Sequence, residues 1–147
     1  FRENAYPGGL TYSGHPLACA AAVATITAME DEGMVENAKR LGEEIIGPRL
    51  AQFAADHPSV GEVRGTGVFW AIELVKNRET REPLAAYGGS SPQMNQVIGA
   101  AKKAGLLPFA NFNRLHVVPA MNIEDAVLIE ALDRLEQALA VADTFVQ

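Results

Sequence analysis

The sequence of 147 residues contains only one cysteine, Cys19, and three histidines that lie far apart. A single cysteine excludes an internal disulfide and any zinc site built from cysteines. The histidines His15, His57 and His116 show no helical i, i+4 pairing, so a metal site is not expected. The neighbours of Cys19 are apolar and rich in alanine. This environment predicts a buried, unreactive thiol.

Basic residues are also few, and no long apolar run is present. The chain has 12 Lys and Arg against 18 Asp and Glu, a net charge of −6 and a pI near 5.0. This acidic balance argues against a nucleic acid or an anionic lipid as partner. No apolar stretch reaches the roughly 18 residues of a membrane span, and no secretory signal pattern opens the chain. We therefore expect a soluble cytoplasmic protein, and a first residue of Phe1 rather than Met predicts a fragment.

The first part of the chain is predicted to be helical. Residues 16–33 are rich in alanine and suited to close packing, with Pro16 in the first turn and Gly33 at the end. Residues 34–58 form an amphipathic pattern, and Pro48 is expected to break or kink this helix because a mid-helix proline loses a hydrogen bond. The apolar positions of this second helix are Met34, Ala38, Leu41, Ile45, Leu50 and Phe53.

The second part mixes strands and helices. Residues 68–75 predict a strand buried on both faces, because apolar residues follow one another without alternation. Short strands are expected at 106–109 and 114–118, joined by the turn-prone sequence ANFN. One helix is predicted at 92–104, and Asn122 is expected to cap a last helix. With 48% hydrophobic residues and about three strands, the chain predicts an α+β two-layer domain, a sheet covered by helices.

The sequence GGLTYSGHP is the strongest local indication of a binding site. It places the hydroxyls of Thr11 and Ser13, and a row of backbone N–H groups, immediately before a helix N-terminus. Such an end binds an anion well, because its first N–H groups have no intrahelical partner and the helix dipole adds positive potential. The alternative is that Thr11 or Ser13 merely caps the helix. The residues alone favour neither interpretation.

Three segments together resemble the C-terminal part of class III, fold-type I, pyridoxal-phosphate-dependent aminotransferases. They are GLTYSGHPLACAAAVA at 9–24, VGEVRGTGVFWAIELV at 60–75 and NRLHVVPAMNIEDA at 113–126. The TYSGHP wording looks most like the branch that uses ω-amino acids or amines with pyruvate. The resemblance implies that residues 34–147 form the small C-terminal domain, with a short, mostly antiparallel sheet. Residues 1–33 would be a cofactor-phosphate loop and linking helix, and the large cofactor-binding domain would lie outside this chain.

The resemblance also implies the cofactor, the partner and the site residues. Pyridoxal 5'-phosphate would be bound at the interface of a homodimer, where Thr11 donates to its phosphate and Leu10 approaches it by the backbone. Arg114 is the candidate for holding a substrate carboxylate, although relatives often place that arginine where His116 stands. The two side chains share one face of the strand because side chains alternate. A structural or solvated arginine remains the alternative for Arg114, and for Arg64 a structural ion pair is favoured.

The lysine that forms the Schiff base in this family is expected outside the chain, because no lysine here fits that role. The four lysines are Lys39, Lys76, Lys102 and Lys103. We therefore expect the whole protein to transfer an amino group from an ω-amino acid or amine to pyruvate or another 2-oxo acid, and this chain alone to be inactive. The alternatives are an aminomutase or racemase of the same fold, and a non-catalytic oligomerisation module.

Overall fold

The computed structural model describes residues 3–4, 8–9 and 11–147, and its internal contacts divide the chain into two units, Phe1–Met34 and Val35–Gln147. The first unit contains helix α1 (Pro16–Asp31), which has no buried residue. Cys19 on this helix is exposed, so the prediction of a buried thiol is wrong for this chain. The physical reason is that no described residue of this unit covers the helix.

In the second unit, helix α2 (Met34–Leu41) runs through a π-helical turn, η1 (Gly42–Ile46), into helix α3 (Gly47–Asp56). Pro48 lies in the first turn of α3, where its missing N–H is tolerated because the wider turn precedes it. The helix is therefore continued by a π turn rather than broken at the proline. The extra residue shifts the core position from the predicted Ile45 to Ile46, which is fully buried five residues after Leu41.

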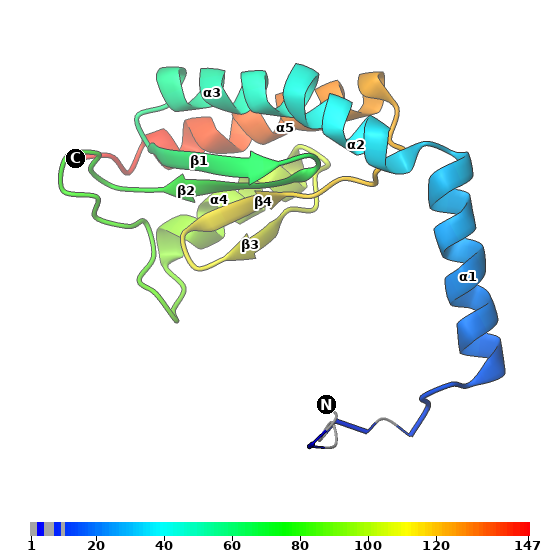
Figure 1. Ribbon diagram of the computed structural model, residues 1–147. Coiled ribbons are helices and arrows are strands. Elements are labelled where there is room, and N and C mark those ends of the chain that lie inside the picture. The colour runs from blue at the N-terminus through cyan, green and yellow to red at the C-terminus, as the bar shows by residue number, and fades with distance from the viewer. Residues whose placement is uncertain (1–2, 5–7, 10) are drawn as a thin grey trace. The chain divides into compact units, whose positions relative to one another are not determined.

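The sheet has four antiparallel strands in the order β1-β2-β4-β3 (Figure 1). They are β1 (Val60–Thr66), β2 (Phe69–Leu74), β3 (Phe109–Asn111) and β4 (Arg114–Val117). Strand β1 was not predicted, because its glycines and charged residues hide the strand pattern. The third strand also begins three residues later than predicted, since Ala110 and Asn111 pair with β4 and leave only two residues for the turn.

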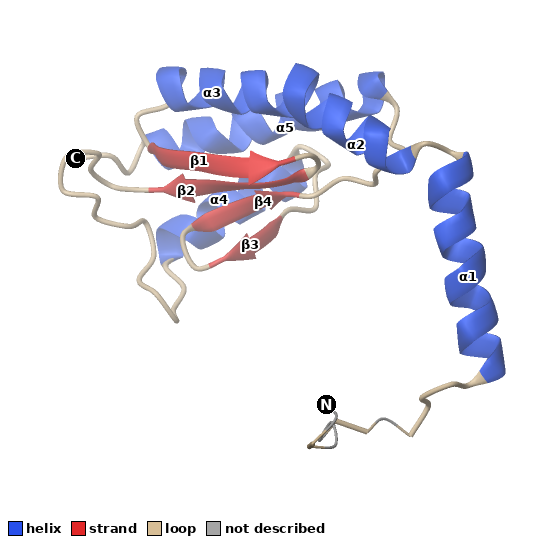
Figure 2. Cartoon of the chain, viewed as in Figure 1, coloured by secondary structure: helices blue, strands red, loops and turns tan. Residues whose placement is uncertain are grey.

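Helices α4 (Pro92–Lys103) and α5 (Asp125–Asp143) pack with α2 and α3 along one face of the sheet (Figure 2). The predicted α+β two-layer arrangement is confirmed. Asn122 does not cap α5: residues 120–123 form a turn, and the helix begins at Asp125 with Glu124 at the N-cap position. The largest buried side chains of this core are Leu41, Ile46, Leu50, Phe53, Ile72, Leu74, Leu84, Met94, Leu115, Leu128 and Leu139.

The opposite face of the sheet carries no helix among the described residues, so β2 is not buried on both faces as predicted. Phe69 on this strand is 63% exposed, whereas its neighbours Ile72 and Leu74 reach the core. We call this second face the open face. By strand alternation and register it presents Glu62, Arg64, Phe69, Glu73, Phe109, Arg114 and His116. No described helix is long and apolar enough to cross a membrane.

Candidate functional site

The first of two candidate sites, each within its own unit, is the turn at residues 11–14, directly before α1. Thr11 is exposed in this turn, and Gly14 adopts a left-handed conformation with φ of 72°. The turn closes through a hydrogen bond from the His15 N–H to the carbonyl of Tyr12 at 3.1 Å. His15 is the N-cap residue, and its side chain makes no capping bond. Leu10, the other residue predicted to approach a phosphate, lies outside the described residues.

This geometry contradicts the alternative in which Thr11 or Ser13 serves only as a helix cap. Cys19 donates its N–H to the His15 carbonyl at 2.9 Å, so regular helical bonding starts there. Pro16 has no N–H, and the amides of Leu17 and Ala18 belong to the first turn, which no side chain caps. An uncapped helix N-terminus of this kind can bind an anion through its free amides and the helix dipole.

The second candidate site is the open face of the sheet, in the second unit, and part of this face is taken up by ion pairs. Arg64 lies 3.1 Å from both Glu62 and Glu73, and Arg81 lies 2.9 Å from Glu62. The hydrogen bonds from Arg81 and Arg64 lower the pKa of Glu62. The prediction that Arg64 serves a structural ion pair is confirmed.

Arg114 is different from every other arginine that the structure describes, because its guanidinium makes no hydrogen bond and no ion pair. Its partner in the sheet register is Glu73, but the Glu73 carboxylate is already bound to Arg64. The arginines that do have partners among the described residues are Arg40, Arg49, Arg64, Arg78, Arg81 and Arg134. A half-buried arginine whose acidic neighbour is already paired elsewhere can bind a carboxylate ligand through two parallel hydrogen bonds.

His116 shares the open face with Arg114, as the alternation of the strand predicts. Its ring lies between the rings of Phe109, at a centroid distance of 5.0 Å, and Phe69, at 6.3 Å. Neither ring nitrogen has a hydrogen-bond partner among the described residues. Burial lowers the pKa of His116 below its usual value of 6.5, and repulsion by Arg114 and Arg64 lowers it further. The lowered pKa favours the neutral form of the His116 ring near pH 7.

The sequence analysis missed two aromatic residues beside Arg114. Phe112 stands in the turn between β3 and β4, and Tyr87 belongs to the long connection between β2 and α4. Both line a cavity of about 290 Å³ that Arg114 also lines. The only sequence signal for Phe112 was its place in the turn-prone ANFN, and Tyr87 lay in a segment predicted as an exposed loop.

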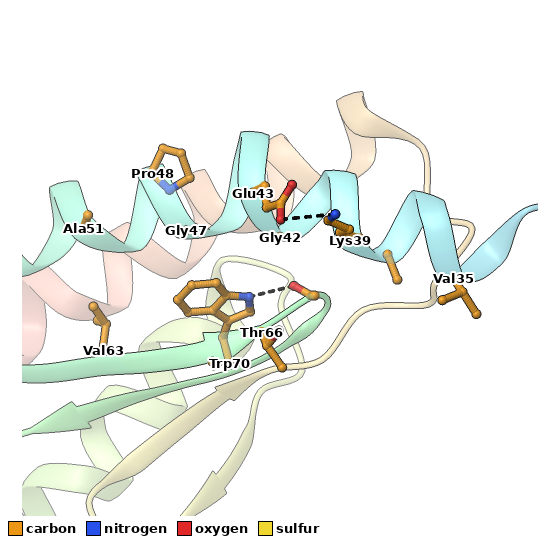
Figure 3. A pocket seen from close by; sticks show the side chains of 13 residues that line it. Val35, Lys39, Gly42, Glu43, Gly47, Pro48, Ala51, Val63, Thr66 and Trp70 are labelled. Atoms are coloured by element: carbon orange, nitrogen blue, oxygen red, sulfur yellow. Dashed lines mark hydrogen bonds and ion pairs between the residues drawn. The ribbon is translucent and has the colours of Figure 1, made fainter.

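A larger groove, of about 740 Å³, lies between α2, η1 and α3 on one side and the turn from β1 to β2 on the other (Figure 3). Trp70 lies across its floor and donates its indole N–H to the Gly67 carbonyl at 2.7 Å. Lys39 and Glu43 form an exposed ion pair at its edge, at 4.0 Å. Neither Arg114 nor His116 lines this groove, so it is separate from the candidate site on the open face.

Comparison with known proteins relates the whole arrangement to one family. The family model for aminotransferase class-III matches residues 4–139. The taurine–pyruvate aminotransferase of Bilophila wadsworthia is 34% identical over 140 residues, which covers 90% of this chain and 29% of that protein. The ethanolamine-phosphate phospho-lyase homolog 1 of Caenorhabditis elegans is 31% identical over 134 residues, 89% of this chain and 27% of the relative.

Among solved structures, the taurine:2-oxoglutarate aminotransferase of Bifidobacterium kashiwanohense, in complex with PLP and glutamate, superposes with a TM-score of 0.88. It is 33% identical, and the match covers 98% of this chain and 32% of that chain. The chain thus spans about 30% of the length of these relatives.

Proposed function

Because the chain belongs to the class-III aminotransferase family, we propose that it forms the C-terminal part of a pyridoxal-phosphate-dependent transaminase. The parent protein would transfer an amino group from an ω-amino acid or amine to pyruvate or another 2-oxo acid. The similarity to a taurine–pyruvate aminotransferase supports this substrate class. Since this chain spans about 30% of its relatives, the activity is proposed for the parent protein and not for these residues alone.

The observation that carries the proposal is the unpaired guanidinium of Arg114 on the open face. Every neighbouring carboxylate on this face is bound to another arginine, so Arg114 keeps its charge for a ligand. A guanidinium can donate to both oxygens of a carboxylate at once, and this fixes the orientation of the substrate. We assign Arg114 the carboxylate of the ω-amino acid or of the 2-oxo acid.

Thr11 and Leu10 are the residues that would bind the phosphate of pyridoxal 5'-phosphate. The uncapped N-terminus of α1 and the exposed Thr11 in the turn before it suit such an anion. When bound, this cofactor supplies the electron sink for amino-group transfer. A homodimer that shares the cofactor phosphate across its interface is part of the proposal. A cytoplasmic location stays a prediction from composition.

The lysines of the chain support the expectation that these residues alone are inactive. Lys76 is bound to Glu82 at 3.0 Å, Lys39 pairs with Glu43, and Lys102 and Lys103 are exposed at the end of α4. The lysine required for transamination would then belong to the remainder of the parent protein.

The direct test is to incubate the parent protein with pyridoxal phosphate, pyruvate and either taurine or β-alanine, and to measure the alanine formed. We expect alanine to accumulate. If neither donor, nor an amine such as 1-phenylethylamine, forms an amino acid with pyruvate or with 2-oxoglutarate as acceptor, the proposed transaminase is wrong. The purified 147-residue chain serves as the comparison and is expected to form none.

Thr11→Ala tests the phosphate site separately. Loss of one charge-assisted hydrogen bond of about 1.5–3 kcal/mol should weaken cofactor binding about tenfold or more. Thr11→Ser keeps the hydroxyl and should bind the cofactor nearly as the parent does. Titration with pyridoxal phosphate measures the cofactor affinity of both variants. Unchanged affinity of Thr11→Ala would favour a non-catalytic oligomerisation module, in which the turn has no ligand.

A member of the same family with another reaction is the second candidate. The similarity to a phospho-lyase homologue supports it, because that name describes an elimination and not a transfer to a 2-oxo acid. An aminomutase or racemase would share the same domain. The same assay separates these cases, since only a transaminase consumes pyruvate in proportion to the donor.

A further inference from the structure

The turn that connects β3 and β4 contains a strained residue. Asn111 and Arg114 are paired in the ladder, so only Phe112 and Asn113 make the turn. Phe112 has a φ of 56°, in the left-handed region that favours glycine or asparagine. Asn113 is buried and holds the turn in place, because its Nδ2 donates to the Leu74 carbonyl at 2.9 Å and its own carbonyl accepts from the Leu74 N–H at 2.8 Å. The turn itself therefore gives no reason for a phenylalanine at position 112.

The reason for the phenylalanine lies in what its ring contacts. The ring centroid of Phe112 is 4.8 Å from that of Tyr87, in a tilted arrangement, and the Arg114 guanidinium carbon lies 5.7 Å from the Phe112 centroid. Tyr87 is 89% exposed, so this pair of rings does not belong to the hydrophobic core. A cation close to an aromatic ring is attracted by the negative charge of the ring face. The Phe112 ring thus provides a cation–π contact for Arg114, which has no hydrogen bond or ion pair among the described residues.

A second strained residue lines the same cavity. Among the described residues, only Arg81, with a φ of 61°, and Phe112 combine a positive φ with a non-glycine side chain. Both line the cavity of about 290 Å³ beside Arg114. Strained backbone conformations of this kind are concentrated at functional sites. The Arg81 guanidinium is bound to the Gly61 carbonyl at 2.8 Å and to Glu62, which leaves Arg114 as the cation available to a ligand.

We propose that Phe112 is a positioning residue for Arg114, and that the cavity they share borders the subsite for the substrate carboxylate. Arg81, Tyr87 and Glu73 also line this cavity, and the Glu73 carboxylate is neutralised by its ion pair with Arg64. The ring restricts the long Arg114 side chain to orientations in which the guanidinium faces the ligand. Tyr87, from the connection between β2 and α4, packs against the Phe112 ring and helps to hold it in place. The inference rests on the proposed function of Arg114. It adds Phe112 and Tyr87 as residues that influence how tightly Arg114 binds the carboxylate.

The test uses the parent protein with its cofactor, in single-turnover reactions with the donor alone. β-Alanine is the donor with a carboxylate, and 1-phenylethylamine is the donor without one. For Phe112→Gly and Phe112→Asn we expect the β-alanine concentration at half-maximal rate to rise about two- to fivefold, as loss of an exposed cation–π contact implies. The maximal rate and the response to 1-phenylethylamine should change little.

The same variants have an opposite effect on stability, which a purely structural role would not produce. Glycine and asparagine tolerate the left-handed backbone, so the thermal unfolding midpoint should stay level or rise. Phe112→Tyr keeps the ring and should restore parental behaviour with β-alanine. Phe69→Leu is the matched control, because this exposed ring on the open face lies against His116 and not Arg114. It should leave the ratio of half-saturating concentrations for the two donors unchanged.

Two results would overturn the inference. One is an unchanged β-alanine response in Phe112→Gly and Phe112→Asn while Arg114→Ala impairs it, which leaves the proposed role of Arg114 intact. The other is an equal loss with both donors together with a lower unfolding midpoint, which describes a structural residue. If Arg114→Ala itself has no effect on β-alanine, the proposed role of Arg114 fails, and this outcome is distinct from the other two.

Discussion

The positive charge of Arg114 is available to a ligand because the neighbouring carboxylates are already paired with other arginines. Glu73 lies opposite on β2 but binds Arg64, and Glu62 binds both Arg64 and Arg81. A substrate carboxylate would therefore not have to displace an internal carboxylate from Arg114. Arg114 is therefore the residue that we propose for the substrate carboxylate.

Arg114→Ala should raise the half-saturating concentration of β-alanine about tenfold or more, because a charge-assisted pair contributes about 1.5–3 kcal/mol. Arg114→Lys keeps the charge but loses the bidentate hydrogen bonding. Its half-saturating concentration of β-alanine should therefore lie between those of the parent and of Arg114→Ala. Single-turnover kinetics with β-alanine and 1-phenylethylamine measure the difference. An equal effect on both donors would contradict a carboxylate-binding role.

His116 is expected to make stability depend on pH. Its pKa is lowered in the folded protein by burial, then by Arg114 and Arg64, so the folded state binds a proton less readily than the unfolded state. Stability should therefore fall as the pH drops below about 6.5, where the unfolded chain takes up the proton. His116→Phe keeps an aromatic ring between Phe69 and Phe109 and should reduce this loss. The loss of stability is measured from urea unfolding midpoints at about pH 7.5 and about pH 5. An identical loss in His116→Phe would contradict the role of His116.

Among the elements, the π turn η1 is adapted to two constraints. It accommodates Pro48, and it brings Gly42 against the turn between β1 and β2. A Cβ atom on Gly42 would lie 2.3 Å from the Gly67 carbonyl oxygen, a backbone atom that cannot swing away. The close approach of helix and turn at this point therefore requires glycine.

Gly42→Ala should lower the free energy of unfolding by about 1–3 kcal/mol, because the added methyl group forces backbone shifts. Gly99→Ala is the matched control: Gly99 lies within α4, and a Cβ there would meet nothing within 4 Å. This substitution should leave stability level or increase it by up to about 1 kcal/mol, since alanine favours helix. Urea unfolding of both variants measures the contrast, and a similar loss in the two would refute the packing argument.

At the scale of the whole molecule, the C-terminal end of α5 is fastened to the corner between α3 and β1. Asp143 accepts from the Ser59 N–H at 3.1 Å and the Ser59 hydroxyl at 2.6 Å, and its other oxygen lies 2.7 Å from His57 Nδ1. Ser59 is fully buried and His57 nearly so. The Asp143 carboxylate thus joins the end of α5 to two residues that precede it by 84 and 86 positions in the sequence.

Asp143→Ala should lower the free energy of unfolding by about 1–3 kcal/mol, because buried donors lose their acceptor. Asp133, like Asp143, lies on α5, and it is an exposed ion-pair partner of Arg49 on α3. Asp133→Ala should therefore lower the free energy of unfolding by less than about 1 kcal/mol. Chemical denaturation of the two variants compares them. Equal effects would mean that the Asp143 contacts contribute no more than a surface ion pair.

Local sequence determined the helices, the α+β class and the family, because these depend on the spacing of apolar residues and on short motifs such as TYSGHP. The start of α1 at Pro16 was also predictable, since Pro16 and the polar residues before it act through neighbours in the chain. Arg114 and His116 were placed on one face by strand alternation alone.

Only the tertiary structure decided which of these residues are free to bind. Strand β1 was missed because it is stabilised by pairing with β2 more than by its own composition, and its Arg64 is what binds Glu73 and leaves Arg114 unpaired. The strained Phe112 and its contact with Tyr87 depend on two loops 25 residues apart in sequence that meet in space. Such pairings are non-local, and no pattern within a single segment contains them.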